Sequence, residues 1–431
     1  MEDADLSRRT LLKGGSAVLA GFSAMQIAGP ARAFAAPAGA ADDLAEGEDG
    51  ANIGPSGDVL PWLDQPADVP PPAQSVVGNL LEWEALSSFR TPSDNFFTVK
   101  HYELPAIDAT QYRLVIDGLV DYPMSVSLAD LKHRARRAVD FTLECSGNTG
   151  LPFFIGGIGN ARWAGTPLAA LLREAGIKKE GSEVVFWGED SGIVTIRDDS
   201  GITGAGTAGT VVPDDGGGLD LTITEQFARS MSVADAMNEE NLLCYNMNGG
   251  PLPPEHGFPV RLIAPGWYGV ANVKWLNRIE VRDKRFTGRF MARDYVSIRE
   301  EVLPNGDLNW TFSTVGHARL KSAPAKVVRH DGKHTVVGVA WGAPIAAVQV
   351  RIDDGPWSPT ELIGPKPSKR GFTWRFWKYE WGTPAAGEHT VTSRALDTAG
   401  NLQPAPDDPF LVAKQTYWES NGQITRRVQI V

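Results

Sequence analysis

The sequence predicts an α+β domain over residues 76–315, followed by an all-β sandwich over residues 316–431. Helix-like and strand-like patterns alternate in the first part, whereas the second part consists of short strand-like runs separated by turn residues. The chain has 431 residues, which is enough for two or three domains with substantial cores. We therefore expect two folded domains of different secondary-structure class.

The N-terminal segment has the pattern of an export signal. Residues 7–13 read Ser-Arg-Arg-Thr-Leu-Leu-Lys, which matches the twin-arginine pattern, and a weakly apolar stretch follows. The sequence predicts a twin-arginine signal over residues 1–35, with an uncleaved anchor as the alternative. Residues 36–75 are rich in Ala, Gly, Asp, Glu and Pro, which predicts a disordered linker. We expect a periplasmic or otherwise extracytoplasmic protein, exported with its cofactor already bound.

Four elements are expected in the first domain. Residues 111–118 have the pattern of a strand that ends in an Asp-Gly turn, and residues 183–187 that of a second strand. Residues 127–132 form a short helix pattern with a serine cap. Residues 166–176 predict a clear helix, because threonine precedes it, proline lies in its first turn and glycine ends it.

The second domain has a different secondary-structure pattern, made of short strands. Strands are expected over residues 335–341, 345–352, 372–377 and 389–396, and no helix pattern interrupts them. Several alternating strands within about 100 residues are typical of an antiparallel sandwich of immunoglobulin type.

Charge and cysteine content exclude several classes of protein. The net charge of −11 argues against nucleic acid as a partner, because phosphate binding needs a basic face. Two cysteines are too few for a disulfide framework or a four-cysteine zinc site. Cys244 lies in an apolar run and is expected in a core strand. There is no Cys-x-x-Cys-His motif, so the sequence encodes no c-type haem site of its own.

Cys145 is the first candidate for chemistry. It lies between a strand-like run and a Gly-Asn turn, which predicts a rigid and exposed thiol. A thiolate is a strong ligand for soft metals. The alternative is an inert core cysteine, and the export signal favours the ligand.

A second candidate is a phosphate-binding loop. His256 and Arg261 lie among glycines and prolines, and Lys274 follows a short distance along the chain. Cationic side chains of this kind bind phosphate groups. An ordinary loop followed by a solvated strand is the alternative.

Taken in order, these segments resemble the sulfite oxidase family of molybdenum-cofactor enzymes. The resemblance runs from Thr91 to the C-terminus and rests on six motifs in the family's order. The motifs are Thr91–His101, Leu143–Asn148, Arg162–Leu168, Met247–Arg261, Val270–Trp275 and Arg394–Pro404.

The resemblance implies a cofactor and its binding residues. Cys145 would be the protein thiolate on molybdenum, beside the two dithiolene sulfurs of one pyranopterin (molybdopterin). Tyr295 and Arg375 match active-site positions of the family. The residues that match pterin-binding and phosphate-binding positions are Phe97, His101, Asp190, His256, Arg261, Asn272 and Lys274. The first domain would then be a sulfite oxidase-like molybdopterin domain, and the immunoglobulin-like domain would mediate homodimerisation.

The implied reaction is oxygen-atom transfer to sulfite or a related reduced sulfur compound, with electrons passed to a separate acceptor, expected to be a c-type cytochrome. Val99 and Gly150 stand where typical members have arginines, while Arg375 retains a third. The loss of two of these three cations would weaken sulfite binding substantially, unless Lys100 or Arg162 substitutes for them. The run Cys-Ser-Gly-Asn-Thr-Gly resembles instead the sulfane dehydrogenase subunit, whose sulfur substrate is carried on a partner protein.

Two other functions compete with this one. A sulfoxide or other oxide reductase would use the same cofactor, but such reductases tend to lack the sandwich domain. A cofactor-free immunoglobulin-like binding protein would have no use for the set His256, Arg261, Lys274 and Tyr295.

Overall fold

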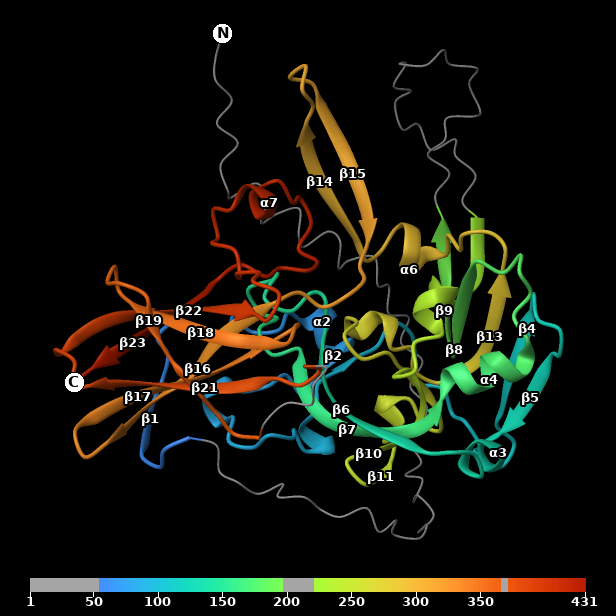
Figure 1. Cartoon of the computed structure of the whole chain (residues 1–431), viewed down its shortest axis with the longest axis horizontal. Coiled ribbons are helices and arrows are strands. Elements are labelled where there is room, and N and C mark those ends of the chain that lie inside the picture. The colour runs from blue at the N-terminus through green and yellow to red at the C-terminus, as the bar shows by residue number, and fades with distance from the viewer. Residues whose placement is uncertain (1–53, 197–220, 366–370) are drawn as a thin grey trace.

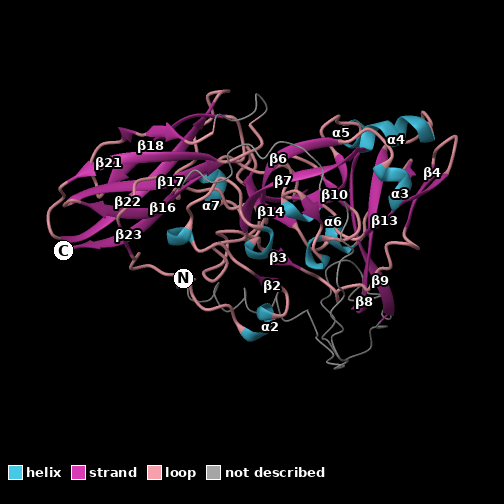
Figure 2. Cartoon of the chain, turned by 90° about the horizontal axis from the view of Figure 1, so that it is seen from below, coloured by secondary structure: helices cyan, strands magenta, loops and turns pink. Residues whose placement is uncertain are grey.

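The computed structural model describes residues 54–196, 221–365 and 371–431 (Figure 1). The expected signal over residues 1–35 lies outside them. Strands dominate the described chain and the helices are short, as Figure 2 shows. Within these ranges the longest helix is α4 (Leu168–Ala175), and no helix has the length and apolar character needed to cross a bilayer. The expected α+β part is therefore mostly β.

The first sheet of the N-terminal half has the strand order β5-β4-β13-β8-β9. All its neighbouring strands are antiparallel except β4 and β13, which are parallel. The two strands expected from the sequence, over residues 111–118 and 183–187, both occur in it. The strands are β4 (Arg113–Gly118), β5 (Met124–Ser127), β8 (Glu183–Ile196), β9 (Leu221–Ser232) and β13 (Leu276–Arg282).

The second sheet positions the site. Its strand order is β11-β10-β7-β6, and β12 also pairs with β10. Cys145 directly follows β6, and Cys244 is fully buried on β10, which confirms its expected core position. The strands are β6 (Arg137–Glu144), β7 (Ile158–Pro167), β10 (Leu242–Met247), β11 (Gly250–Pro251) and β12 (Arg261–Ile263).

Helix caps follow the sequence closely. Helix α3 (Leu128–Lys132) has a capping box, in which the side chains of Ser127 and Asp130 each bind the other's backbone N–H. Helix α4 ends at Gly176, whose φ of 70° is readily adopted only by glycine. The other short helices of this half are α2 (Pro71–Gln74), η1 (Trp83–Ala85), η2 (Ser93–Asn95), α5 (Val233–Ala236), η3 (Pro254–His256), η4 (Gly269–Ala271) and α6 (Arg289–Ala292).

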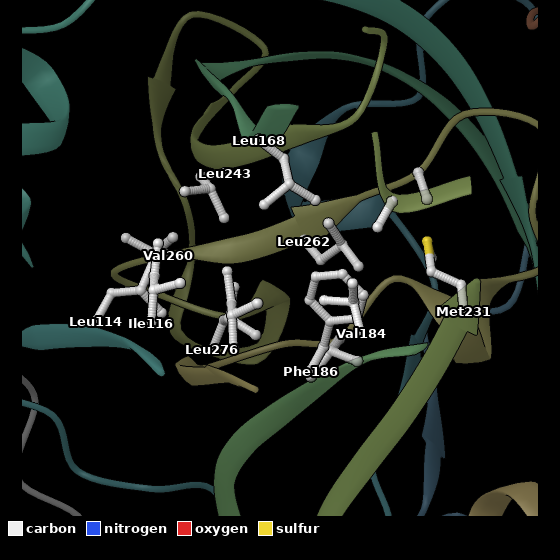
Figure 3. Packing of buried hydrophobic residues seen from close by; sticks show 14 of the residues in the cluster. Leu114, Ile116, Leu168, Val184, Phe186, Met231, Leu243, Val260, Leu262 and Leu276 are labelled. Atoms are coloured by element: carbon white, nitrogen blue, oxygen red, sulfur yellow. The ribbon is translucent and has the colours of Figure 1, made fainter. Parts of the chain in front are cut away.

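One core joins these two sheets and helix α4. Figure 3 shows side chains from β4, β8, α4 and β10 directed toward one another, among them Leu114, Phe186, Leu168 and Leu243, which are all fully buried. Burial of each such side chain stabilises the fold by about 1.5–3 kcal/mol. The sheets therefore form one rigid scaffold beneath the loops that carry the site.

The C-terminal half contains two antiparallel sheets, with strand orders β1-β16-β17-β21-β20 and β19-β18-β22-β23. Both sheets contribute to one apolar core, with Val336 and Trp377 from the first and Val348 and Val391 from the second. Its strands are β1 (Asp58–Leu60), β16 (Lys321–His330), β17 (Lys333–Trp341), β18 (Ile345–Ile352), β19 (Ser358–Pro359), β20 (Glu361–Ile363), β21 (Arg375–Gly382), β22 (Gly387–Asp397) and β23 (Ile424–Ile430). The immunoglobulin type of this half stays a prediction.

Several elements differ from the expectation. The strand expected over residues 372–377 begins only at Arg375, and helix α7 (Pro409–Val412) lies in a region where no helix was expected. A hairpin of β14 (Val296–Val302) and β15 (Leu308–Thr314) projects between the two halves in Figure 1. A small sheet of β2 (Val77–Gly78) and β3 (Thr98–Val99) completes the described strands.

The prediction of a disordered linker over residues 36–75 is wrong for its C-terminal part. Strand β1 pairs with β16, and Figure 1 places it beside the C-terminal strands. Trp62 is 2% exposed, and its indole N–H donates to the Ala325 carbonyl at 2.8 Å. A three-residue strand surrounded by Asp, Gly and Pro is too short to stand out in composition, which explains the error.

Candidate functional site

One pocket gathers all the predicted site residues except Arg375. Most of them come from loops and strand ends of the N-terminal half, whereas Asp190 lies within β8. The predicted residues that line it are Phe97, His101, Cys145, Asp190, His256, Arg261, Asn272, Lys274 and Tyr295.

The Cys145 thiol lies in a turn closed by hydrogen bonds. Its backbone N–H donates to the Gly157 carbonyl at 2.8 Å, and its carbonyl accepts from the Asn148 N–H at 3.0 Å. The expectation of an exposed thiol is wrong, because the residue is only 7% exposed. Burial raises its pKa to about 12, so the metal-free side chain is a protonated thiol. Metal binding must displace this proton.

A buried ion pair, which the sequence did not indicate, fixes this turn. Lys321 Nζ lies 2.6 Å from Glu144 Oε1, and both side chains are fully buried. The other carboxylate oxygen accepts from the Trp341 indole at 2.8 Å, and Asn148 donates to Glu144 at 3.0 Å. The pair therefore ties the turn after β6 to the C-terminal sheets. A lysine at the first position of a strand is normally exposed, so no local pattern could have revealed it.

Arg261 forms the cationic part of the pocket. Its guanidinium donates to the His256 carbonyl at 3.1 Å and to the Asn272 carbonyl at 3.0 Å. Asn272 fixes its own loop, since its amide accepts from the Ala264 N–H at 2.7 Å and donates to the Tyr268 carbonyl at 3.0 Å. Hydrogen bonds within the chain thus hold the loops that carry these residues.

Lys274 lies in the same part of the pocket. Its ammonium donates to the carbonyls of Val99 at 2.9 Å and Glu255 at 2.8 Å. Burial, followed by repulsion from Arg261, lowers its pKa, while burial raises the pKa of Asp190. Their charges interact, so each moderates the shift of the other.

Burial also lowers the pKa of Arg261 to about 10 and that of His256 to about 3. The pocket therefore concentrates basic groups whose charged forms are poorly compensated by the chain. An anion bound there would remove that deficit.

Two unused polar atoms point to a polar ligand. Among the described residues that line the pocket, Asp190 Oδ1 and Arg261 Nε are buried and have no hydrogen-bond partner. Also within the described ranges, no three His, Cys, Asp or Glu side chains converge to form a metal site. A metal bound to the lone Cys145 thiolate would need further ligands from a cofactor. The donor set fits a soft metal held by an anionic organic cofactor.

Tyr295 lies beside this thiol in a strained backbone conformation, with a φ of 59°. Its hydroxyl and His101 Nε2 are hydrogen-bonded at 2.6 Å. Burial lowers the pKa of His101 to about 3, so the imidazole is neutral. The His101 ring stacks on Phe227, with 4.7 Å between ring centroids, which fixes the orientation of the pair.

The cations expected from the sequence do not line this pocket. Arg375 donates to the Pro365 carbonyl instead. Lys100 faces Glu103 at 3.7 Å, and Arg162 faces Asp140 at 3.9 Å.

Sequence reasoning also missed an aromatic segment from the C-terminal half. The Trp418 ring lies 4.3 Å from the Tyr295 ring, measured between centroids, and 4.0 Å from the Tyr417 ring. The only local signal was the Tyr-Trp pair itself, in a stretch without strand or helix pattern.

A buried thiol and a cluster of cations in one pocket fit an oxidoreductase that binds a metal through an anionic organic cofactor. Residues 101–290 match the family model described as the oxidoreductase molybdopterin binding domain. Sulfite oxidase of Gallus gallus is 32% identical over 341 residues, which cover 73% of this chain and 68% of that protein. Mitochondrial sulfite oxidase of Mus musculus is also 32% identical, over 73% of this chain and 57% of that protein. The chain belongs to the sulfite oxidase family, and its cofactor is molybdenum with molybdopterin.

The fold is also found in a solved structure. The sulfane dehydrogenase SoxCD from Paracoccus pantotrophus matches with a TM-score of 0.66 and 24% identity. The match covers 90% of this chain and 96% of that one. At this identity the likeness concerns the fold alone.

Proposed function

We propose that this protein is an extracytoplasmic enzyme that transfers an oxygen atom to sulfite or a related reduced sulfur compound. The observation that carries the proposal is the presence of the Cys145 thiol and the Arg261–Lys274 cation cluster in one buried pocket. Family membership supports a sulfur substrate, and the twin-arginine pattern supports export.

Each part of the pocket has a role in this proposal. Arg261, Lys274 and His256 would bind the anionic end of the cofactor, and Cys145 would bind its molybdenum. When bound, the cofactor supplies oxygen-atom transfer and storage of two electrons. Tyr295, held by His101, would orient a bound substrate by a hydrogen bond from its hydroxyl. Burial of the site excludes water from the reacting atoms.

The proposal includes partners. The sequence has no c-type haem motif, so the electrons would pass to a separate acceptor such as a c-type cytochrome. The C-terminal sandwich, as an immunoglobulin-like domain, would form a homodimer.

Metal analysis combined with turnover tests the proposal. We expect one molybdenum and one pterin per chain, together with oxidation of a reduced sulfur compound that reduces cytochrome c or ferricyanide. Cys145→Ser should abolish turnover in a folded protein. Cys244→Ser is the matched control, because Cys244 is also buried but does not line the pocket. A molybdenum-free wild-type protein, or full activity of Cys145→Ser, would contradict the proposal.

A further inference from the structure

Arg229, on strand β9, carries a buried charge that the chain compensates only in part. The side chain is 1% exposed, and burial lowers its pKa to about 10, so it stays charged at neutral pH. Its guanidinium donates to the carbonyls of Phe290 and Val315. Within the described residues its Nε has no hydrogen-bond partner, and no carboxylate forms an ion pair with it. A buried cation without a counterion destabilises a fold, and such exceptions are typical of functional sites.

The two carbonyls that Arg229 binds lie on either side of Tyr295. Phe290 is in α6, shortly before Tyr295, and Val315 directly follows β15. The Val315 N–H donates to the Tyr295 carbonyl at 2.9 Å, so Arg229 connects the chain before this residue with the chain that pairs with it. Tyr295 has a φ of 59°, which is unfavourable for a residue with a side chain. Surrounding contacts must therefore hold its backbone, and Arg229 contributes to them.

Strand β9 also supports the histidine that binds the Tyr295 hydroxyl. Phe227 precedes Arg229 by two positions, and side chains two apart on a strand point to the same face. The Phe227 ring lies 4.7 Å from the His101 ring, measured between centroids, and the Phe290 ring lies 4.8 Å from it. His101 Nε2 and the Tyr295 hydroxyl are 2.6 Å apart. One face of β9 thus supports both the backbone and the hydroxyl of Tyr295.

The charge of Arg229 acts on the same pair of side chains. Burial raises the pKa of Tyr295 well above its ordinary value, and the positive charge of Arg229 acts against this rise. Burial keeps His101 neutral, and the Arg229 charge adds to this effect. A neutral His101 can donate from Nε2 to the Tyr295 oxygen, which leaves the phenol proton for a substrate. A nearby cation strengthens such a donor, because it stabilises negative charge on the phenol oxygen.

We propose that Arg229 is a positioning residue, which holds the backbone on both sides of Tyr295 and strengthens the Tyr295 hydroxyl as a hydrogen-bond donor to the substrate. The inference rests on the proposed function, in which Tyr295 orients the substrate. It adds a residue that does not line the pocket. Arg229 therefore acts only through Tyr295.

A double-mutant cycle on the molybdenum-loaded protein tests this inference. Sulfite and thiosulfate are the substrates, ferricyanide is the acceptor, and rates are expressed per molybdenum. Arg229→Gln should lower kcat/KM about tenfold in the wild-type background, and by less than about twofold in the Tyr295→Phe background, where the hydroxyl is missing. A purely structural role predicts the same loss in both backgrounds. Arg278→Gln is the matched control, because Arg278 pairs with Asp117 outside the pocket and should change kcat/KM in neither background.

Arg229→Lys separates the charge of this side chain from its shape. Lysine keeps the positive charge but lacks the planar fork of donors. We expect a loss of about threefold in kcat/KM, which again disappears in the Tyr295→Phe background. Equal losses in Arg229→Lys and Arg229→Gln would overturn the role of the charge. If Arg229→Gln does not fold, the cycle with Arg229→Lys decides the inference.

NMR of the metal-free protein gives a readout that does not depend on turnover. With tyrosine isotope-labelled at the Cζ carbon, the Tyr295 signal is assigned by its loss in Tyr295→Phe. The chemical shift of this carbon responds to hydrogen bonding and charge at the phenol. We expect the signal to move in Arg229→Gln, and to move less in Arg229→Lys. A signal that stays in place in Arg229→Gln would overturn the inference.

The outcomes separate the inference from the proposed function. Equal losses in the two backgrounds, or wild-type kcat/KM in Arg229→Gln, overturn the inference alone, provided that turnover still needs Cys145. Full activity of Tyr295→Phe removes this tyrosine from the mechanism, and the inference with it. A wild type that oxidises neither sulfite nor thiosulfate contradicts the proposed function, whereas the NMR comparison still decides whether Arg229 acts on Tyr295.

Discussion

Two histidines of the pocket, His101 and His256, are buried as neutral imidazoles, which links the stability of the cofactor-free protein to pH. Burial lowers the pKa of each to about 3, against 6.5 in the unfolded chain. Below pH 6.5 the unfolded chain therefore binds protons that the folded protein does not, so stability is full above pH 6.5 and is lost as pH falls.

We predict that lowering the pH from 7 to 5 costs the cofactor-free protein about 2 kcal/mol of unfolding free energy per histidine. Urea unfolding at a series of pH values measures this. His256→Gln should remove about half of the histidine contribution. An unchanged pH dependence in this variant would contradict the prediction, because it would show that folding does not shift the pKa of His256.

Lys274 combines a stability cost with a binding role. Its side chain is half-buried, and desolvation lowers its pKa. We predict that Lys274→Met stabilises the cofactor-free protein by about 1 kcal/mol and lowers its molybdenum and pterin content about tenfold. Thermal unfolding and metal analysis provide the two measurements. Lys179→Met, at a site whose side chain is 92% exposed, is the control and should change neither.

Among the helices and strands, those with a clear capping, alternation or turn pattern in their own residues could be predicted from the sequence. Helix α4 and strand β18 follow from their own residues, because capping and alternation are local patterns. The β14–β15 hairpin was missed although Asn305-Gly306 is a turn signal between its strands. Its alternation gives little guidance, because the apolar side chains of Trp310 and Phe312 are exposed.

The contact between β6 and β16 depends on the Glu144–Lys321 pair. We predict that Lys321→Met destabilises the protein by about 3–5 kcal/mol, because it leaves the Glu144 carboxylate buried without its cation. Denaturant unfolding measures the loss. Lys378→Met is the control, since this lysine pairs with Glu361, whose side chain is 66% exposed, and should cost at most about 1 kcal/mol. Equal losses in the two variants would contradict the structural role of the buried pair.

At the scale of the whole molecule, the site joins segments that are far apart in the sequence. Resemblance to the family predicted which residues line the pocket, from Phe97 to Tyr295, and the structure brings them together. Resemblance could not predict that Tyr417 packs against Gly147 and Gly150 of the turn after Cys145, because the two segments lie far apart in the sequence and meet only through the tertiary fold. The prediction that Arg375 belongs to the active site fails for a related reason. A motif identifies the residue, but it does not show where the strand that carries it runs, and Arg375 donates to the Pro365 carbonyl outside the pocket.

Residues 58–64 pack against the C-terminal half of the molecule, although the two are far apart in the sequence. Trp62 packs in the core between the two C-terminal sheets, and the Arg426 guanidinium lies 5.2 Å from its ring centroid.

We predict that Trp62→Ala lowers the free energy of unfolding by about 3–5 kcal/mol, as is usual for a fully buried tryptophan. Leu63→Ala is the matched control, because the neighbouring side chain is 45% exposed and should change stability by less than about 0.5 kcal/mol. Denaturant unfolding followed by tryptophan fluorescence tests both. A Trp62→Ala protein as stable as the Leu63→Ala protein would restore the interpretation of residues 58–64 as a linker and would place the start of the cooperative fold after them.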